Sequence, residues 1–542
     1  MPQACLPRRP QRSRGNAVLV LDGATADYRG ITEAFGRVCA QTRSMTTTPT
    51  PATTPDYIVI GAGSAGSVLA RRLTDSRAST VLLIEAGADE RPDKIRDPAS
   101  WASLIGSEYD WGFHTEAQHG LDDRVLVYPR GRVVGGSSSV NGVVHIRGRR
   151  SDFDDWAEHG ARNWSYDDIE PFMDRSEHLD EDALDTGGVH VSRPFPLSPI
   201  AGAVLDAMSE DDRVEEVGMH TMSVLGMERS SAADGYLTPA VRERPALTLL
   251  PDATVTRLVI EDGTCVGVEV TVDSERRVLR AGREVLLAAG AIGSPHLLMV
   301  SGIGPAAQLE SFGIPVLVDA PDVGENLQDH PRGGVTVAVE TPTDYVGEGV
   351  SGLLSVGATD VQLLFTGVPQ YPDTMAGPER GFTLTVSPMH PTSRGTVRLT
   401  GPEIADEPAI DPALLATPED LAVMVEGIRI ARQLIAKADL DEWEIRESLP
   451  GPSVVDDADL ATYARQVTQS YYHAVGTCRL GSDERSVVDE DLRVRGVDGL
   501  RVVDASVMPS LVSANPNPTV YTIAERAASM ILAAAHDSAL RA

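Results

Sequence analysis

The hydrophobic pattern of residues 57–85 predicts a strand, a helix and a second strand. "YIVI" (57–60) is a short apolar run, as expected for a strand that is buried on both faces. "SVLARRL" (67–73) places its apolar residues at helical spacing, and "TVLLIE" (80–85) is a second apolar run. This order of elements is typical of a doubly wound α/β sheet.

The pattern further along the chain predicts a second kind of sheet. Residues 247–272 hold two runs of alternating hydrophobicity around Asp262-Gly263, a dipeptide that favours a hairpin turn. Residues 332–400 contain several strand-like runs that Gly and Pro interrupt. We expect these later runs to form the sheet of a second domain.

Two helices are predicted in the last third of the chain. Residues 417–436 are amphipathic and open with a capping pattern, Thr417 to Asp420. A last helix is predicted over 518–535, with Pro518 at its first position, where a missing N–H costs nothing.

The turn after the first strand carries a glycine fingerprint, G-x-G-x-x-G, at Gly61, Gly63 and Gly66. In this strand-turn-helix context the glycines let the backbone approach a pyrophosphate, which the helix N-terminus attracts. Glu85 ends the second strand, where an acid reaches the hydroxyls of an adenosine ribose. The segment predicts a dinucleotide site and leaves the choice between NAD and FAD open.

Composition narrows the class of protein. The 542 residues are 42% hydrophobic and 23% charged, with a net charge of −32, which disfavours nucleic acid and anionic membranes as partners. No apolar run reaches the roughly 18 residues of a membrane span. The four cysteines show no C-x-x-C spacing, so neither a disulfide framework nor a metal site is expected. Their pattern favours a reducing, cytoplasmic location.

Residues 1–52 are expected to be a disordered N-terminal extension and linker outside the fold. Their start is basic but lacks a secretory apolar segment, and 46–55 is rich in Thr and Pro. Met45 stands immediately before this linker and is a second candidate start of translation.

Four further stretches bear on chemistry: "GRVVGGSSSVNG" (131–142), "GAIGSPHLLMVSGIG" (290–304), "SYYHAVGTCRLG" (470–481) and the segment 500–528 around "NPNPTV". Each alone also fits an ordinary structural role, such as a loop into a helix or a packed histidine. With "VGENLQDHP" (323–331), their order and spacing over residues 56–535 resemble the glucose-methanol-choline (GMC) oxidoreductase family, including choline dehydrogenase-like enzymes.

The resemblance implies a bound FAD and two interleaved domains. A Rossmann-type FAD-binding domain would be assembled from 53–150, 231–331 and 462–542. An α+β substrate-binding domain with an antiparallel sheet would be assembled from 151–230 and 332–461.

The resemblance also implies the residues that hold the cofactor. They are Gly61, Gly63, Ser64, Ala65 and Gly66 at the pyrophosphate, Glu85 at the ribose, Val133, Ser137, Asn141, Gly142, Val143 and Val144 along the flavin and its linker, Val255 at the adenine, Asp504 and Ala505 at the ribityl chain, and Thr519 and Val520 at the flavin pyrimidine ring. Some members attach the flavin to a histidine where this chain has Val140, so noncovalent FAD is expected.

His473 matches the family's catalytic histidine, and Asn517 is expected at the partner position. Alcohol oxidation then needs His473 to take the hydroxyl proton, Asn517 to donate a hydrogen bond to the oxygen, and flavin N5 to take a hydride. His145 stands where an aromatic residue is expected and is either packed or a second polar group near the substrate.

The substrate is expected to be an uncharged, partly apolar alcohol, because Tyr471 and Tyr472 precede His473 and few charges are near them in sequence. Oxygen or another electron acceptor would reoxidise the flavin. The alternatives are a cyanohydrin lyase or a light-dependent decarboxylase on the same scaffold, or a non-catalytic flavin-binding protein.

Overall fold

The computed structural model describes residues 53–75, 79–179, 186–194, 196–340, 349–357 and 359–541. All of them belong to one compact unit, Pro49–Ala542. The predicted extension, residues 1–52, lies outside the described residues.

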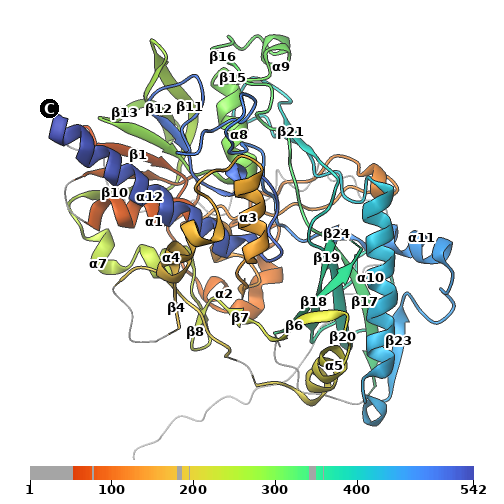
Figure 1. Ribbon diagram of the computed structural model, residues 1–542. Helices are drawn as coiled ribbons and strands as arrows, with labels where there is room; N and C mark the ends of the chain where they lie inside the picture. The colour runs from red at the N-terminus through yellow and green to blue at the C-terminus, as the bar shows by residue number, and fades with distance from the viewer. Residues whose placement is uncertain are drawn as a thin grey trace, which may run out of the picture. The chain divides into compact units, whose positions relative to one another are not determined.

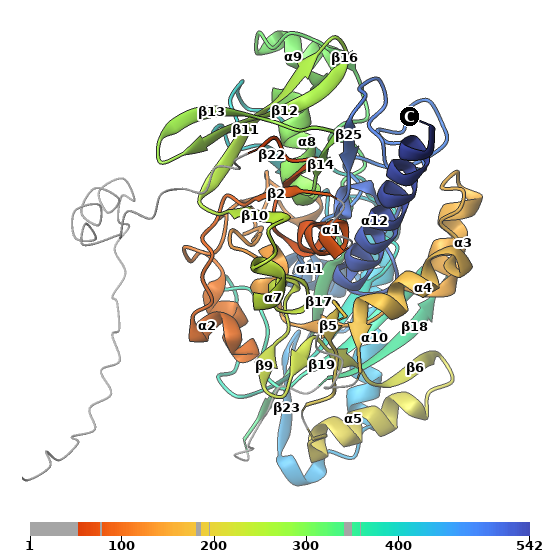
Figure 2. The ribbon, with the colours of Figure 1, turned by 90° about the vertical axis from the view of Figure 1, so that its left-hand side faces the viewer.

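A five-stranded parallel sheet forms the first half of the fold, in the order β10-β2-β1-β14-β25. Its strands are β1 (Tyr57–Ile60), β2 (Val81–Ile84), β10 (Leu247–Leu250), β14 (Glu284–Leu287) and β25 (Leu500–Val502). Helices α1 (Ser64–Asp75) and α12 (Pro516–Arg541) pack together on one side of this sheet (Figures 1 and 2). The predicted strand-helix-strand opening is confirmed.

A three-stranded antiparallel sheet lies on the other side with helix α8 (Gly290–Val300) (Figures 1 and 2). Its strands are β11 (Ala253–Glu261), β12 (Thr264–Val272) and β13 (Glu275–Arg280). Asp262 and Gly263 join the first two strands with φ angles of 48° and 81°, as a hairpin turn with two left-handed residues requires. The predicted hairpin is confirmed.

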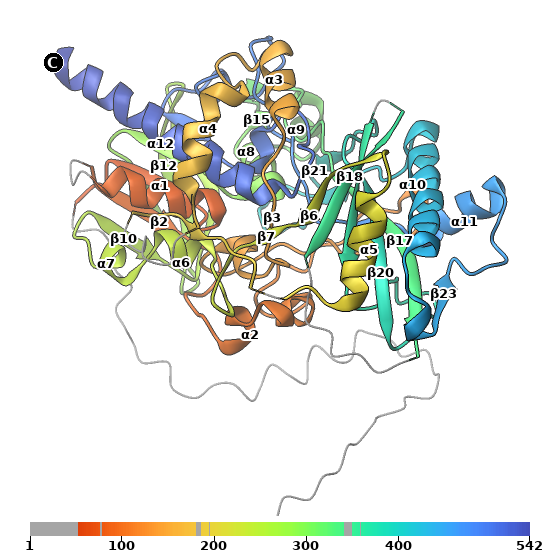
Figure 3. The same cartoon turned by 60° about the horizontal axis from the view of Figure 1, so that its bottom comes forward.

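A larger antiparallel sheet forms the second half, in the order β23-β17-β20-β19-β18-β6, with β24 also paired to β17. Its strands are β6 (Val214–Met219), β17 (Pro331–Val339), β18 (Val350–Val356), β19 (Thr359–Thr366), β20 (Gly381–Pro388), β23 (Ile445–Leu449) and β24 (Gln469–Ser470). Helices α5 (Pro199–Ser209) and α10 (Pro418–Lys437) pack on the face turned away from the parallel sheet (Figures 1 and 3). Thr417 caps α10 by accepting the Asp420 amide, as predicted.

The remaining helices are short or connect these layers. They are α2 (Asp93–Arg96), α3 (Arg150–Glu158), α4 (Tyr166–Ser176), α6 (Ala232–Tyr236), α7 (Pro239–Arg242), α9 (Ala306–Ser311), α11 (Asp457–Val467) and the 3₁₀ turns 98–104, 119–121, 136–139, 441–443 and 505–507. The remaining strands pair two by two: β3 (Val144–His145) with β7 (Thr221–Met222), β4 (Glu177–His178) with β5 (Val189–His190), β8 (Val224–Leu225) with β9 (Glu228–Arg229), β15 (Ile303–Gly304) with β16 (Val318–Asp319), and β21 (Thr396–Arg398) with β22 (Ala409–Asp411).

Packing assigns some segments differently from the predicted domain boundaries. Helices α3 and α4, expected in the substrate-binding domain, contribute Phe153, Trp156 and Ile169 to the hydrophobic core of the parallel sheet. The reason is that α4 lies along α12. Strands β21 and β22 join the same core through Val397 and Ile410. The boundaries therefore stay predictions, with helices α3 and α4 and strands β21 and β22 packed on the nucleotide side.

Candidate functional site

The turn from β1 into α1 has the shape of a pyrophosphate cradle. A Cβ atom added at Gly66 would come within 1.8 Å of the Gly61 carbonyl oxygen, so this glycine lets the helix pack on the turn. A Cβ atom added at Gly63 would meet only the Gly136 Cα atom, at 3.7 Å. The Gly63 backbone is therefore open to a ligand, as close approach of a phosphate requires.

Glu85 follows β2 and is 6% exposed. Its carboxylate oxygens accept the backbone N–H groups of Ala62, at 2.9 Å, and Gly87, at 2.8 Å. Burial raises the pKa of Glu85 to about 7, while these two hydrogen bonds oppose the rise. A carboxylate held at the strand end beside the glycine turn fits the ribose of an adenine dinucleotide.

The turn 131–142 lies against this cradle. Asn141 accepts hydrogen bonds from the Val143 amide, at 3.1 Å, and from Nη1 of Arg229, at 2.7 Å. Val143 has a φ of 57°, which is costly for a β-branched residue and is typically kept at functional sites. Sequence reasoning missed Arg229, because it follows Asn141 by 88 residues and belongs to no motif.

Asp504 connects the last strand of the parallel sheet with the turn before α8. It is 3% exposed and accepts from the Gly290 amide, at 2.8 Å, and from the Ser294 and Ser506 hydroxyls, each at 2.5 Å. Burial raises the pKa of Asp504, and these hydrogen bonds oppose the rise. The side chain therefore joins the stretch 290–304 to the segment 500–528, both of which the sequence pattern singled out.

The other predicted cofactor residues lie around the same turns. Ser64 and Ala65 begin α1, Ser137 lies in the 3₁₀ turn and accepts the Gly131 amide, Val133 packs its side chain into a small apolar cluster, Gly142 faces open space, Val144 begins β3, Val255 lies in β11, Ala505 follows Asp504, and Thr519 and Val520 lie in α12. Taken together, these residues fit an FAD that extends from the cradle toward 131–144 and α12.

Helix α12 begins at Pro516, two residues earlier than predicted, so Pro518 is not its first residue. Asn517 thus lies in the first turn of the helix, where its side-chain oxygen accepts the Ser64 hydroxyl at 2.6 Å. The expectation that Asn517 pairs with His473 is wrong in this structure. Its side chain instead joins the start of α12 to the glycine turn.

His473 is part of a chain of hydrogen bonds that fixes its tautomer. Nε2 of His330 is 2.9 Å from the Met389 carbonyl oxygen, which can only accept, so this nitrogen carries the proton. Nδ1 of His330 must then accept from Nδ1 of His473, at 2.8 Å. Nε2 of His473 is therefore unprotonated and carries a lone pair, as a base needs.

Asn515 occupies the partner position that was predicted for Asn517. Its Nδ2 atom is 3.2 Å from Nε2 of His473 and can donate to that lone pair. Asn515 is 8% exposed. It precedes the first residue of α12, so the helical rotation does not set the direction of its side chain. An alcohol oxygen placed beside both groups could accept a hydrogen bond from the Asn515 amide and give its own proton to Nε2 of His473.

The backbone around His473 is held by buried polar groups. Asp329 accepts the His473 amide, at 2.8 Å, and the Ser470 hydroxyl, at 2.5 Å. Tyr472 has a φ of 66°, and Nη1 of Arg130 donates to its carbonyl oxygen at 2.8 Å. The backbone of Tyr472 is therefore in the left-handed region, which is strained for a tyrosine, directly beside the buried histidine.

Burial dominates the electrostatics of the two histidines. It lowers the pKa of His330 to about 3. It also holds the pKa of His473 well below its usual range, and the neighbouring His330 ring and the positive charges of Arg130 and Arg332 lower it further. Both imidazoles are therefore neutral near pH 7, in agreement with the tautomers above.

His145 is a packed histidine. It is 2% exposed, its Nδ1 atom is 2.8 Å from the Ser223 hydroxyl, and its Nε2 atom is 2.5 Å from the Glu177 carboxylate. Both ring nitrogens are thus engaged within β3 and its neighbours. Of the two expectations for this residue, the structure bears out packing.

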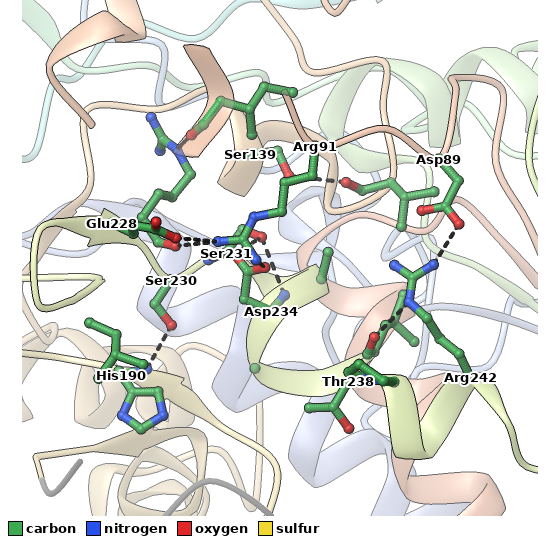
Figure 4. A pocket seen from close by; sticks show the side chains of 18 of the residues that line it. Asp89, Arg91, Ser139, His190, Glu228, Ser230, Ser231, Asp234, Thr238 and Arg242 are labelled. Carbon is green, nitrogen blue, oxygen red and sulfur yellow. Dashed lines mark hydrogen bonds and ion pairs between the residues drawn. The ribbon is translucent and has the colours of Figure 1, made fainter. Parts of the chain in front are cut away.

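A cavity of about 410 Å³ lies behind the turn 131–142 (Figure 4). Its charged side chains pair with one another: Arg91 with Asp234, and Arg242 with Asp89. Its lining includes neither His473 nor Asn515. The cavity thus lies apart from the His473–Asn515 pair, and we assign the chemistry to His473.

The described residues contain neither a metal-ligand cluster nor a membrane-spanning helix. Within the described ranges, no three or more His, Cys, Asp and Glu side chains are grouped to hold a metal ion. None of the helices that the structure describes has the length and apolar character needed to cross a bilayer.

Comparison with known proteins shows what the whole chain is similar to. Residues 55–332 and 391–524 match two family models, both described as GMC oxidoreductase. The chain is 39% identical to choline oxidase of Arthrobacter globiformis over 88% of its own length and 94% of that protein's. It is 36% identical to an oxygen-dependent choline dehydrogenase of Photobacterium profundum, over 89% and 93%.

A solved structure shows the same fold. Pyridoxine 4-oxidase, from an organism given as Mesorbium loti, superposes with a TM-score of 0.81 and 34% identity. The match covers 88% of this chain and 99% of that one. The expected fold, an α/β flavin-binding half combined with an antiparallel sheet, is confirmed.

Proposed function

Because the chain belongs to the GMC oxidoreductase family and is an FAD-dependent oxidoreductase of CH–OH donors, we propose that it oxidises an alcohol with His473 as the base and Asn515 as its partner. The observation that carries the proposal is the hydrogen-bond chain from the Met389 carbonyl through His330 to His473. That chain leaves a neutral Nε2 with a lone pair beside the Asn515 amide.

The chain's own residues would act on the alcohol oxygen. Nε2 of His473 takes the hydroxyl proton, and Nδ2 of Asn515 donates a hydrogen bond to the same oxygen as it gains charge. The resulting imidazolium keeps its Nδ1 proton and donates it in the hydrogen bond to Nδ1 of His330. Because the group is buried, few waters compete for these hydrogen bonds.

Bound FAD supplies the acceptor for the hydride that leaves the carbinol carbon, and oxygen or another electron acceptor reoxidises it. Gly63 would hold its pyrophosphate and Glu85 its adenosine ribose, while the turn 131–142 would hold the flavin end. This placement rests on the open face of Gly63 and on the buried carboxylate of Glu85.

We propose that the FAD is noncovalent. Val140, at the position where some relatives carry a linking histidine, has an alkyl side chain that packs against a small apolar cluster. Acid precipitation of the purified protein should therefore release yellow FAD into the supernatant. Colour that stays with the precipitated chain would contradict noncovalent binding.

The activity itself is tested by anaerobic mixing of the FAD-loaded protein with a panel of alcohols. A substrate alcohol should bleach the flavin absorbance near its visible maximum, and readmission of an acceptor should restore it. Cleavage of a cyanohydrin without bleaching by any alcohol would favour the lyase alternative instead.

A further inference from the structure

Arg332 lies beside His473, although the sequence predicted an uncharged surrounding. Strand β17 pairs Arg332 with Gln469 of β24, two residues before the first of the two tyrosines that precede His473. The Arg332 guanidinium carbon is 5.6 Å from the Tyr471 ring centroid. The Tyr471 ring in turn stacks on the His473 imidazole, with centroids 4.4 Å apart.

The Arg332 guanidinium has donors to spare. Nη1 donates to the Gln370 side-chain oxygen at 3.1 Å, and a guanidinium carries five N–H donors. Within the described part of the chain, Arg332 forms no ion pair with a carboxylate. The side chain is half-buried, so its charge is only partly screened by water.

A second arginine near His473, Arg130, contacts the backbone and an aromatic ring. Arg130 donates to the Tyr472 carbonyl, and its guanidinium carbon lies 4.8 Å from the Tyr128 ring centroid. Its charge also acts on the buried Asp329 carboxylate. Within the described residues neither arginine forms an ion pair, but Arg130 is bonded to the backbone beside His473 and lies near the buried Asp329 carboxylate, whereas Arg332 donates only to an amide oxygen.

We propose that the substrate alcohol carries an anionic oxygen group, a carboxylate or a phosphate, that Arg332 binds while the hydroxyl meets His473 and Asn515. A planar guanidinium with free donors matches such groups in a two-point hydrogen bond. The same charge opposes a quaternary ammonium, so choline is a poor substrate although relatives are named for it. The inference rests on the proposed function and adds the substrate class.

Matched probes test the charge of the substrate. The FAD-loaded protein is mixed anaerobically with 4-hydroxybutanoate, the monophosphate of 1,4-butanediol, 1,4-butanediol itself and choline. One or both anionic alcohols should bleach the flavin with a kcat/KM at least about tenfold above that of the neutral diol, the usual worth of a hydrogen bond to a charged group. Choline should bleach the flavin most slowly of the four compounds. Comparing the rates of the two anionic alcohols shows whether the site prefers a carboxylate or a phosphate.

Variants of Arg332 assign the effect to this side chain. Arg332→Gln should lower kcat/KM for the preferred anion about 10- to 100-fold and change that for the diol less than about threefold. Arg332→Lys keeps the charge and should lose less than Arg332→Gln, although it loses the fork geometry. Arg276→Gln, an equal charge change on exposed β13, is the matched control and should leave both values unchanged.

A second readout does not need turnover. Butanoate and butyl phosphate have no hydroxyl to oxidise, and calorimetry should show one of them binding to the holoenzyme and losing that binding in Arg332→Gln. Equal losses for the anion and the diol in Arg332→Gln, or a preference for choline, would overturn the inference and leave alcohol oxidation standing. If no alcohol bleaches the flavin, the proposed function fails, and the calorimetry alone decides whether Arg332 is an anion site.

Discussion

Two asparagines, Asn515 and Asn517, are separated by one proline and are expected to behave differently when each is changed to alanine. Asn515 donates to Nε2 of His473, whereas Asn517 accepts from the Ser64 hydroxyl at the glycine turn. Asn515→Ala should therefore impair the chemical step, and Asn517→Ala should impair retention of FAD.

The size of the first effect follows from the burial of the pair. Asn515 is 8% exposed and His473 is 9% exposed, so a lost hydrogen bond to the alcohol oxygen is not replaced by bulk water. Losing one such donor to a developing charge costs about 2.7–4 kcal/mol, or roughly 10²–10³ in rate. We expect Asn515→Ala to slow anaerobic flavin bleaching by that factor while the protein keeps its FAD.

The second effect is smaller because the bond between Ser64 and Asn517 joins two neutral groups. Such a bond is worth about 0.5–1.5 kcal/mol, so Asn517→Ala should raise the Kd of FAD by roughly 2- to 15-fold. The bleaching rate of the FAD-loaded fraction should stay within about threefold of the unchanged protein, because Asn517 is not bonded to His473.

The assay is stopped-flow bleaching by the best alcohol, with FAD content measured on the same preparations. His473→Ala is the reference variant and should slow bleaching by about 10²–10⁴-fold. The double variant His473→Ala/Asn515→Ala should be slowed by less than the product of the two single effects, because both residues act on the same oxygen. A slow, FAD-replete Asn517→Ala beside a fast Asn515→Ala would refute the reasoning and restore the pairing expected from sequence.

Three further outcomes are expected. The bleaching rate should be level from about pH 6.5 to 9 and fall only in more acidic buffer, because the lowered pKa of His473 keeps the base neutral there; an ionisation near pH 7 in the rate profile would contradict this. Gly63→Ala should fold but bind little FAD, since its Cβ would occupy the open ligand side, whereas Gly66→Ala should fail to fold because its Cβ would collide with a backbone oxygen; circular dichroism and FAD content separate the two. Glu525→Gln should lower the free energy of unfolding by about 3–5 kcal/mol in urea titrations, because it removes the fully buried carboxylate that pairs with Arg72 and leaves only the partly exposed Asp75, at 3.4 Å, beside that charge; a loss below about 1 kcal/mol would show that the pair contributes little.

The sequence by itself determined the elements that depend on local pattern. The apolar runs of 57–60 and 80–85 and the glycines between them are sufficient to predict a nucleotide-binding strand-turn-helix, because burial and close backbone approach restrict residue type at those positions. The Asp262-Gly263 hairpin and the cap of α10 were predictable for the same reason, since each depends on neighbouring residues only.

Spacing along the chain did not determine which asparagine meets His473. Asn515 and Asn517 both match a polar residue before a helix, and the choice between them depends on where α12 begins. Because the helix starts at Pro516, Asn515 stays outside it, whereas Asn517 is rotated about 100° per residue to another side. A shift of two residues in one helix start therefore changes the assigned partner.

The charge and tautomer of the site were decided by tertiary structure alone. His330 immediately precedes β17, Arg332 lies in β17 and Met389 follows β20, and no local pattern links them to His473. The pairing of β17 with β24 brings them together. Hydrophobic periodicity predicts which face of a strand is buried, but it does not predict which distant strand becomes its neighbour, and that neighbour sets the electrostatics of the base.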